Sequence, residues 1–386
     1  MKVFKLIFKN ALRHKLRTIL TVLGIAVAVI AFGILRTVVT SWSAGLEASA
    51  ANRLIARQAI SFIFPLPYTY GAKISSVPGV EEVTYANWFG GVYIDKNNFF
   101  SRIAVDPDTY FDVYPEYILT KEEMETFKRE RNSCVIGSKI AKQYNLKIGD
   151  VMTLEGDIYP GEWQFIIRGI YQPKEKSTDA SQMFFQWDYL NERMKQEMSG
   201  RDGNVGWYII KIANSANSAE ISTQIDALFK NSNAETKTET ERAFTQGFIA
   251  SSGAIITAMD FMSFVIVGII MLVLGNTMIM AARERTREYA VMKTLGFSAK
   301  HIIGLILGES LFVSMLGGAL GLFFVIPIVA SFEEVIPKGF FPVFRLEETT
   351  IIMAISAAIL IGVASAVFPI IRALKTKIVD GFRFVG

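Results

Sequence analysis

The sequence predicts a membrane protein with four transmembrane helices and a large extracytoplasmic α+β domain inserted between helices 1 and 2. The 386 residues are 51% hydrophobic and only 20% charged, with a mean hydropathy of +0.33, whereas soluble chains carry about 25% charged residues. The shortage of charge is concentrated in four long apolar runs. Residues 41–245, between the first and second runs, have the composition of a globular domain.

The composition also excludes several classes of protein. Intrinsic disorder does not fit a chain with 29 Phe and a net charge of only +4. A single cysteine, Cys134, excludes an intramolecular disulfide framework and a cysteine-based zinc cluster. Only two histidines are present, His14 and His301, and each has basic neighbours. Histidine-centred metal or triad chemistry is therefore not expected.

Four apolar runs are long enough to cross a bilayer, because a helix needs about 20 apolar residues to span about 30 Å. They are Thr18–Leu35, Phe261–Ala282, Ile302–Phe332 and Thr349–Ile371. The first run also resembles a secretory signal followed by a cleavage site at Ala48–Ala50. However, it is longer than the apolar core of about 7–15 residues that a signal peptide has, and the triplet lies too far beyond it. We therefore expect a retained transmembrane helix.

The distribution of basic residues predicts the orientation. Residues 1–17, 283–300 and 372–386 together contain fifteen Lys and Arg but only three acids. Basic residues near the ends of spans mark the cytoplasmic side. Both termini and segment 283–300 are therefore expected in the cytoplasm, and the acidic connector 333–348 on the outside.

The region between the first two spans shows signals of mixed secondary structure. Strands are expected in β-branched and aromatic runs, and helices where apolar residues recur at a spacing near 3.6. The expected strands are Val92–Ile94, Trp163–Ile170 and Trp207–Ile212, and the expected helices are Lys121–Arg131, Ser138–Tyr144 and Ser218–Phe229.

Two flanking segments have patterns of their own. Residues 243–282 contain a single charge, Asp260, which favours a helix that continues from the membrane into the external domain as a stalk, over a short loop and an ordinary span. Residues 1–17 place apolar and basic side chains at helical spacing. This suits an amphipathic helix on the anionic inner leaflet, or an unstructured basic segment that only sets the topology.

No catalytic motif is present. The sequence contains no G-x-x-x-x-G-K-[ST], no H-E-x-x-H and no G-x-S-x-G, so we expect neither ATP hydrolysis by a phosphate-binding loop nor hydrolase chemistry in this chain. Glu309 lies inside the third span, where an ionisable group is costly. We expect it to face a polar helix partner such as Asn276–Thr277, as a structural or coupling contact rather than a proton relay.

Small residues in the third span predict close helix packing. Gly317, Gly318 and Gly321 let another helix approach. They indicate a tight bundle or a dimer seam, together with Glu309.

Several segments carry a resemblance to a known family. They are Asn10–Thr18 before Leu23–Ile25, Glu284–Glu288 with Val291–Gly296, Glu309 with the three glycines, Cys134–Gly137 with Ala141 and Leu146–Asp150, and Pro369 with Arg372–Ala373 and Val379–Arg383. Over nearly the whole chain this pattern resembles the MacB/FtsX-type, or type VII, ABC transporter permeases, and the external segments resemble the MacB-type periplasmic core. The tail departs from the family, in which Asp-Pro usually precedes the final helical segment.

The resemblance implies a non-catalytic permease subunit that couples ATP hydrolysis by a separate ATPase to a conformational change of its external domain. The implied partners are two ABC ATP-binding subunits, which bind the ATP, a second permease copy in a homodimer, and membrane lipid, but no nucleic acid. A periplasmic adaptor and an outer-membrane channel are left open, as are a regulatory role and the choice among lipid, lipoprotein, peptide and drug substrates. The implied location is the bacterial inner (plasma) membrane.

With the resemblance, segment 283–300 becomes the expected contact with the ATPase. The candidate coupling residues are Arg283, Glu284, Arg285, Arg287, Glu288, Lys293 and Gly296. Without it, the same charges would describe a solvated cytoplasmic loop. A membrane receptor with an external ligand-binding domain is the alternative, but only fifteen residues follow Ile371, too few for an output module.

The sequence therefore predicts nine segments. They are a cytoplasmic basic segment (1–17), helix 1 (18–40), the external domain (41–245), the stalk with helix 2 (246–282), the coupling segment (283–301), helix 3 (302–332), the external connector (333–348), helix 4 (349–371) and the cytoplasmic tail (372–386).

Overall fold

The computed structural model describes residues 7–8, 10–47, 49–96, 98–175, 178–197, 200–250, 253–335 and 344–375. The chain divides into a helical unit, built from residues 1–40, 253–333 and 344–386, and an α+β unit, built from residues 41–252 and 334–343. Residues 1–6 and 9 of the expected basic segment, residues 336–343 of the connector and residues 376–386 of the tail lie outside the described ranges.

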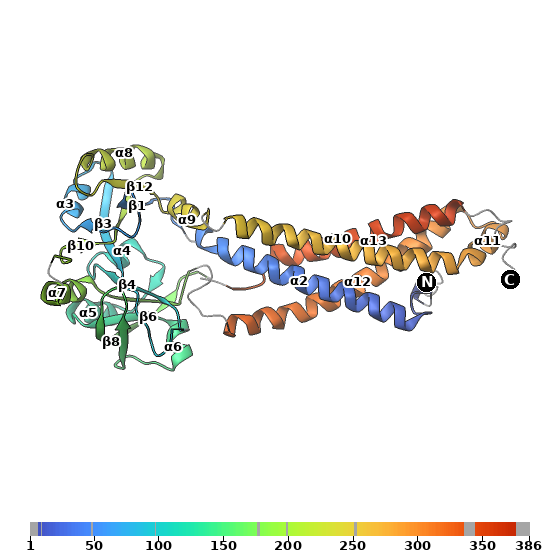
Figure 1. Ribbon diagram of the computed structural model, residues 1–386, viewed down its shortest axis with the longest axis horizontal. Helices are drawn as coiled ribbons and strands as arrows, with labels where there is room; N and C mark the ends of the chain where they lie inside the picture. Colours follow the sequence, from blue (N-terminus) through green and yellow to red (C-terminus); the bar gives the residue numbers. More distant parts are fainter. Residues whose placement is uncertain are drawn as a thin grey trace. The chain divides into compact units, whose positions relative to one another are not determined.

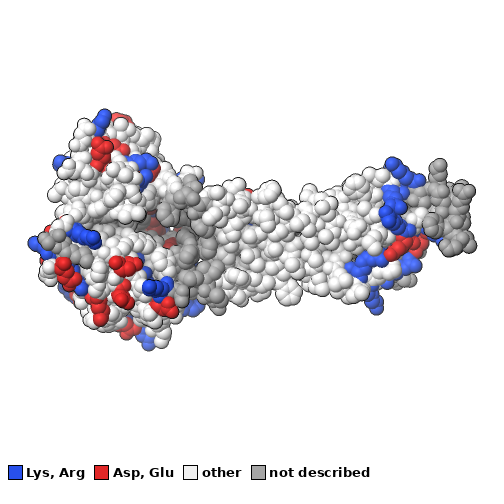
Figure 2. Space-filling view, in the orientation of Figure 1, with Lys and Arg blue, Asp and Glu red and all other residues white. Residues whose placement is uncertain are grey.

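Four long helices form the helical unit, as the sequence predicts. They are α2 (Lys15–Glu47), α10 (Gly253–Glu284), α12 (Ala299–Val335) and α13 (Glu348–Lys375). Each is long and apolar enough to cross a bilayer. Figure 1 shows the four running alongside one another. In Figure 2 their outer surface carries almost no charge except at the end where α11 (Thr286–Thr294) lies.

Small residues let the helices approach closely. A Cβ at Gly317 would lie 2.7 Å from Cβ of Ile25 in α2, and one at Gly321 would lie 2.6 Å from Cβ of Val29. Gly318 faces α13 instead, where an added Cβ would lie 2.8 Å from Cβ of Ala358. The three glycines therefore pack against helices of the same chain, and their contact with a second copy stays a prediction.

Buried polar contacts add to this packing. The Ser310 hydroxyl of α12 donates to the Gly362 carbonyl of α13 over 2.7 Å and lies 3.0 Å from the Ser365 hydroxyl. Toward the end of the helices that is opposite α11, Arg36 of α2 forms an ion pair with Asp260 of α10. Because such groups are costly in hydrocarbon without a partner, these pairs fix which helices are neighbours.

The α+β unit is built on one large mixed sheet. Its strand order is β12-β1-β11-β3-β4-β9-β6-β8-β5, with β7 paired to β8, and β10 and β2 form a separate pair. The strands are β1 (Arg53–Gln58), β2 (Leu66–Pro67), β3 (Val80–Trp88), β4 (Ser101–Val105), β5 (Tyr117–Ile118), β6 (Ser133–Gly137), β7 (Val151–Gly156), β8 (Gly161–Pro173), β9 (Gln182–Gln186), β10 (Asn204–Val205), β11 (Trp207–Ile212) and β12 (Thr236–Thr240). The pairs β4–β9 and β6–β8 are parallel, and the other pairs are antiparallel.

Helices and connecting segments cover both faces of this sheet. They are α3 (Tyr70–Ser75), α4 (Tyr110–Val113), α5 (Lys121–Arg129), α6 (Ser138–Tyr144), α7 (Trp187–Glu197), η1 (Ser215–Asn217), α8 (Ser218–Leu228) and α9 (Glu241–Ala250). Successive residues of β1 enter two different cores: Leu54 and Ala56 join one and Ile55 the other. This is the expected result of the two-residue period of a strand, and it explains why these strands are apolar on both faces.

Two local expectations need correction or completion. Val92–Ile94 is not a strand, because Gly90, Gly91 and Ile94 have positive φ and only isolated bridges form at Val92 and Tyr93. The expected stalk over 243–282 is described as two helices, α9 and α10. Residues 251 and 252 between them lie outside the described ranges.

One buried arginine joins the two ends of the α+β unit. Arg53, at the start of β1, is only 4% exposed. It donates to both carboxylate oxygens of Glu116 (2.7 and 3.0 Å) and to Glu241 at the start of α9 (2.8 Å). Glu241 also accepts the backbone N–H of Ala50 over 3.0 Å. Burial alone would lower the pKa of this guanidinium, but the hydrogen bond to Glu116 and the attraction of Glu241 raise it overall.

Candidate functional site: the α11 segment and its anchors

The candidate site lies where the helical unit collects its charges, around α11. Helix α10 ends at Glu284, and Arg285 leaves helical geometry with φ −100° and ψ 13° before α11 begins at Thr286. At the other end, Gly296 has φ +82°; its N–H donates to Lys293 O, and Phe297 N–H donates to Met292 O. This is a Schellman motif, which favours glycine at the left-handed position. Gly296 therefore ends α11 and separates it from α12.

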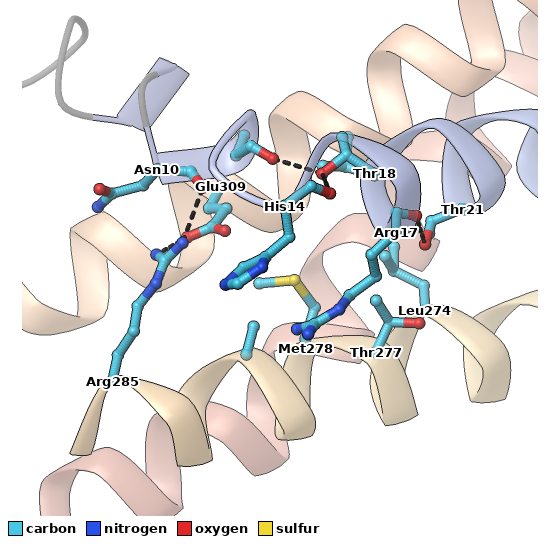
Figure 3. Close-up of a pocket in the computed structure, with 13 residues that line it drawn as sticks. Asn10, His14, Arg17, Thr18, Thr21, Leu274, Thr277, Met278, Arg285 and Glu309 are labelled. Atoms are coloured by element: carbon cyan, nitrogen blue, oxygen red, sulfur yellow. Dashed lines mark hydrogen bonds and ion pairs between the residues drawn. The ribbon is translucent and has the colours of Figure 1, made fainter.

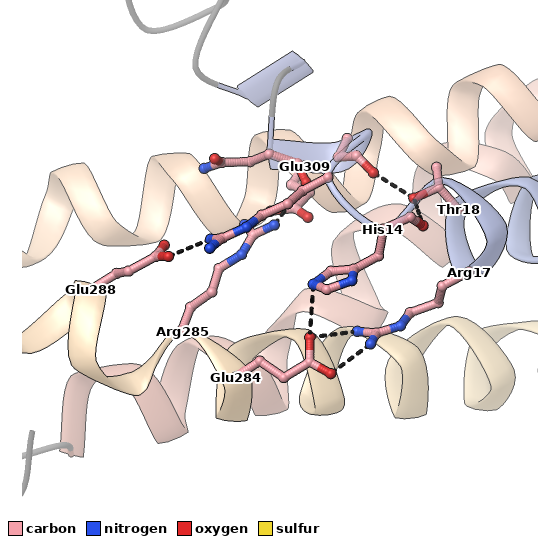
Figure 4. Close-up of polar contacts among 10 residues, drawn as sticks. His14, Arg17, Thr18, Glu284, Arg285, Glu288 and Glu309 are labelled. Atoms are coloured by element: carbon pink, nitrogen blue, oxygen red, sulfur yellow. Dashed lines mark hydrogen bonds and ion pairs between the residues drawn. The ribbon is translucent and has the colours of Figure 1, made fainter. Parts of the chain in front are cut away.

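Two acids hold this segment against the start of α2. Glu284 accepts two hydrogen bonds from Arg17 (2.5 and 3.0 Å), and its carboxylate lies 3.3 Å from Nε2 of His14. One turn further on, Glu288 forms an ion pair with Arg13. Figure 4 shows Glu284 of α10 meeting His14 and Arg17 at the start of α2, with Glu288 of α11 nearby. The two arginines are four residues apart, and so are the two acids, although α2 begins only after Arg13 and a helix break lies between Glu284 and Glu288.

A buried ion pair joins the same segment to α12. Arg285 donates to Glu309 over 2.6 Å and to the Asn10 carbonyl over 2.7 Å. The side chains are only 4% and 8% exposed. We expected Glu309 to contact the Asn276–Thr277 pair, and this prediction is wrong. The Thr277 hydroxyl donates instead to the Val273 carbonyl of its own helix. The carboxylate inside the third span is neutralised by an arginine from the neighbouring segment.

A lysine joins α11 to the end of α13. The Lys293 ammonium donates to the carbonyls of Ala373 (3.0 Å) and Leu374 (2.9 Å). The last carbonyls of a helix have no hydrogen-bond partner within the helix and carry a partial negative charge. The Lys293 ammonium supplies both the missing donor and a positive charge. Segment 284–293 therefore has polar contacts with the start of α2, with α12 and with α13.

A water-sized cavity lies beside the buried ion pair. Its volume is about 30 Å³, and His14, Arg17, Thr21, Arg285 and Glu309 contribute to its lining. Figure 3 shows these polar side chains pointing into the space between α2, α10 and α12. A space of this size accommodates water but not a nucleotide, so the arrangement is suited to holding helices together rather than to binding a ligand.

The opposite face of the segment is exposed. Arg283, Arg287, Val291 and Leu295 recur at intervals of four residues, and all four are exposed. We call this set the exposed stripe. Leu295 is 72% exposed and the adjacent Phe297 is 47% exposed. Among the contacts of the described residues, no ion pair involves Arg283 or Arg287. The stripe combines two cationic side chains with apolar ones, a composition found at protein interfaces.

The seven candidate coupling residues thus separate into two groups. Glu284, Arg285, Glu288 and Lys293 contact the rest of the helical unit, and Gly296 ends the helix. Only Arg283 and Arg287 lie on the exposed stripe.

Sequence reasoning missed the partners of the anchoring residues. Arg13, His14 and Arg17 were expected only to set topology or to lie on the membrane surface. The matching spacing of Arg13 and Arg17 with Glu284 and Glu288 was the available signal.

Comparison with known proteins identifies the family. Residues 18–228 match the MacB-like periplasmic core domain, and residues 261–378 match the FtsX-like permease C-terminal domain. The chain belongs to the MacB/FtsX-type ABC transporter permeases. The second match contains α11, Glu309 and the three packing glycines. Family membership makes the α+β unit an extracytoplasmic domain between the first two membrane helices, and it implies an ATPase partner.

Two curated relatives are also similar to this chain, one over nearly its full length and one over a part. An uncharacterised ABC transporter permease of Methanocaldococcus jannaschii is 24% identical over 402 aligned residues, covering 97% of this chain and 96% of that one. An uncharacterised ABC transporter permease protein of Mycobacterium tuberculosis is 22% identical over 200 residues, covering 52% of this chain but only 22% of that protein.

Solved structures of external regions also match. The periplasmic region of MacB from Actinobacillus actinomycetemcomitans is 13% identical, covering 53% of this chain and 95% of that one, with a TM-score of 0.39. The extracellular domain of the noncanonic ABC-type transporter YknZ from Gram-positive bacteria is 11% identical, covering 49% of this chain and 99% of that one, with a TM-score of 0.36.

Proposed function

We propose that this permease converts ATP hydrolysis by a separate ATP-binding subunit into movement of its extracytoplasmic domain. The movement drives export or extraction of a substrate such as a lipid, lipoprotein, peptide or drug. The observation that carries the proposal is the two-sided construction of segment 283–297. One side is bound by polar contacts to the start of α2, to α12 and to α13, and the other is the exposed stripe.

The end of the helical unit that carries α11 faces the cytoplasm in this proposal. Described Lys and Arg gather there, at the start of α2, around α11 and at the end of α13. Figure 2 shows their side chains concentrated at this end. The excess of basic residues on cytoplasmic segments supports an orientation with both termini inside.

The exposed stripe is the docking surface for the ATPase. Leu295 and Phe297 supply apolar area that water would otherwise cover. Arg283 and Arg287 add cationic groups that steer an acidic partner and set its register. The remaining coupling candidates do not touch the ATPase but hold α11 in position.

Displacement of α11 would reach three membrane helices through separate contacts. The arginines at 13 and 17 carry it to α2, Glu309 carries it to α12, and Lys293 carries it to α13. Coupling between distant sites needs contiguous elements with two discrete arrangements. Ion pairs between helices that each move as rigid rods fit this requirement.

The family resemblance favours a homodimer of permeases with two ATPase subunits. Gly317 and Gly321 face α2 of their own chain, so a second copy would meet another surface. The exposed apolar side chains of α10, among them Phe261, Ile269 and Leu272, offer one. Whether an adaptor and an outer-membrane channel take part is left open by the resemblance.

The test uses the full-length permease, in lipid nanodiscs, with its ABC ATP-binding subunit. Leu295→Asp and Arg287→Glu place negative charge on the exposed stripe. We expect each to reduce co-purification of the ATPase and to lower permease-stimulated ATP hydrolysis by about ten-fold, since a docking contact of about 1.4 kcal/mol corresponds to that factor. Thermal stability of the permease alone should not change.

Lys375→Glu is the matched control, because it reverses a charge at the same end of the helical unit but off the stripe. Normal ATPase binding by both stripe variants would overturn the docking assignment. Co-purification of the permease with a histidine kinase, and without an ATPase, would instead favour the alternative function as a membrane receptor.

A further inference from the structure

The α+β unit contains an open cavity with an unbalanced lining. Its volume is about 490 Å³, within the usual range for small-molecule sites. The segment before α3, α3 itself, β3, β11 and the turn after β4 form its walls. Three carboxylates line it, from Glu81, Glu82 and Asp106, and no described lysine or arginine does. We propose that this cavity binds a flexible organic polycation bearing primary ammonium groups, such as a polyamine or a lysine-rich peptide.

Three tyrosine side chains also line the cavity, those of Tyr68, Tyr85 and Tyr208. Tyr68 is 46% exposed, yet it stacks on Trp187 at 5.0 Å and meets Tyr85 edge-on at 5.3 Å. Tyr208 is fully buried, and its hydroxyl donates to the carbonyls of Pro67 (2.7 Å) and Tyr68 (2.8 Å). Aromatic faces attract ammonium groups, and rings held in this way need no reordering when a ligand binds.

The carboxylates retain capacity for a cation. Glu82 and Asp106 form no ion pair with any residue that the structure describes, whereas Glu81 has Lys211 at 3.8 Å. Asp106 accepts from the Thr109 hydroxyl (2.7 Å) and from the Asp108 N–H (3.1 Å). A carboxylate has about four acceptor positions, so two remain. Burial, followed by the nearby charges of Asp108 and Asp188, raises the pKa of Asp106 despite these hydrogen bonds, and a bound cation would relieve that repulsion.

The spacing of the acids favours an extended ligand over a metal ion. Within the described ranges, no three His, Cys, Asp or Glu side chains converge closely enough to hold a metal. Glu81 and Glu82 lie on β3, and Asp106 lies in the turn between β4 and α4. Two ammonium groups joined by a methylene chain can reach both places at once. The hydroxyls of Thr69 and Ser75 in the lining accept further N–H donors.

The experiment measures binding to the full-length permease by calorimetry. The protein is held in phosphatidylcholine nanodiscs, because anionic lipid would itself bind a polycation. The probes are spermidine and tetralysine, each titrated also into empty nanodiscs. Specific binding of either probe supports the proposal, and the probe that binds identifies the source of the ammonium groups. Equal heats with loaded and empty nanodiscs for both probes would overturn it.

Variants test whether the cavity is the site. The double variant Glu82→Gln/Asp106→Asn should weaken binding at least about ten-fold, since it removes two negative charges that would each accept a hydrogen bond from an ammonium group. Tyr68→Ala should weaken it about three-fold through loss of the aromatic face. Glu125→Gln, an exposed acid on α5, should bind normally. If the double variant does not fold, Glu82→Gln and Tyr68→Ala carry the test.

Mg²⁺ alone is the competitor that separates specific recognition from simple charge. Mg²⁺ should displace spermidine only through general screening of charge, and therefore to the same extent from the wild type and from Glu125→Gln. Binding of Mg²⁺ at the affinity of spermidine, lost in the same double variant, would overturn the assignment to an organic cation. The proposal concerns binding to the extracytoplasmic domain and does not depend on how the ATPase is coupled.

Discussion

Arg285 and Glu309 form a buried ion pair that joins the break between α10 and α11 to the interior of α12, with an N–O distance of 2.6 Å. Arg285 also donates to the Asn10 carbonyl, so this one guanidinium contacts two other segments of the helical unit. A buried charge without its partner is costly, whereas a matched apolar pair of similar volume is often tolerated. The pair is therefore expected to set the position of α11 more than to add net stability.

This relationship predicts a strongly non-additive mutant cycle. Arg285→Met leaves the Glu309 carboxylate unpaired inside the span and should lower unfolding stability by about 3 kcal/mol. Glu309→Gln should cost less, because the neutral amide still accepts from Arg285. The double variant Arg285→Met/Glu309→Met should regain most of the loss. Thermal unfolding in nanodiscs measures the cycle, and additive losses would show that the two residues act separately.

If the Arg285–Glu309 ion pair positions α11, the variants of this cycle should rank differently in ATPase stimulation than in stability. The double apolar variant should fold like the wild type yet stimulate the ATPase poorly, because α11 has lost its link to α12. Normal stimulation by that variant would assign the pair to folding alone.

Close packing of α12 on α2 gives a further prediction. Gly321→Ala would place a Cβ 2.9 Å from the Ala26 carbonyl oxygen, so the helices must separate, and overpacking of this kind costs about 1–3 kcal/mol. Gly304→Ala is the matched control on the same helix, because nothing lies within 4 Å of the added Cβ. It should be neutral or stabilising, since alanine is the better helix former. Equal effects of the two substitutions on thermal unfolding would contradict this account of the glycines.

Much of the architecture was predictable because its signals are local. A charge-free run long enough to span a bilayer is visible within a single stretch such as Phe261–Ala282. The helix at Ser138–Tyr144 and the strand at Trp207–Ile212 also follow from short-range patterns, and both are confirmed. Val92–Ile94 failed because the neighbouring Gly90 and Gly91 turn the chain with positive φ, which outweighs β-propensity.

The candidate site was only half predictable, for the opposite reason. Glu309 and Arg285 stand out as ionisable residues, but their contact depends on the break that Arg285 makes between two helices. The pair between Arg13 and Glu288 joins positions 275 residues apart. No local pattern records which helix lies next to which, so partners of this kind require the three-dimensional packing.

Buried Tyr289 in α11 predicts a pH dependence of stability. It is 3% exposed, and burial is the main cause that raises its pKa to about 12. In the unfolded chain tyrosine ionises near pH 10. Between these values the unfolded state has lost a proton that the folded state keeps, so stability falls as pH rises from 10 to 12.

The expected loss attributable to Tyr289 is about 2–3 kcal/mol by pH 12. Tyr289→Phe removes the ionisable group and should flatten the stability profile over this range relative to the wild type. Unfolding of both proteins in denaturant at pH 9 and pH 11.5 makes the comparison. Identical slopes would mean that the hydroxyl reaches solvent in the folded state.

The last prediction concerns Arg53, which holds the start of β1 and the start of α9 together through Glu241. Arg53→Met would leave Glu116 and Glu241 without their cation, although their side chains are only 21% and 13% exposed. Removing one partner of a buried pair typically costs about 3–5 kcal/mol. We therefore expect Arg53→Met to be among the most destabilising substitutions in the α+β unit.

Arg57→Met is the matched control, because Arg57 lies on the same strand and pairs with a single acid, Glu239, over 3.2 Å. Its side chain is 17% exposed, against 4% for Arg53, so its loss should cost about 1 kcal/mol or less. Hydrogen exchange of the full-length protein should show faster exchange around β1, α9 and Glu116 in Arg53→Met only. Since Glu241 also accepts the Ala50 N–H, the two ends of the domain that lead to membrane helices α2 and α10 would then loosen together. Equal exchange in both variants would mean that the backbone pairing of β1 with β11 and β12 is sufficient to hold them.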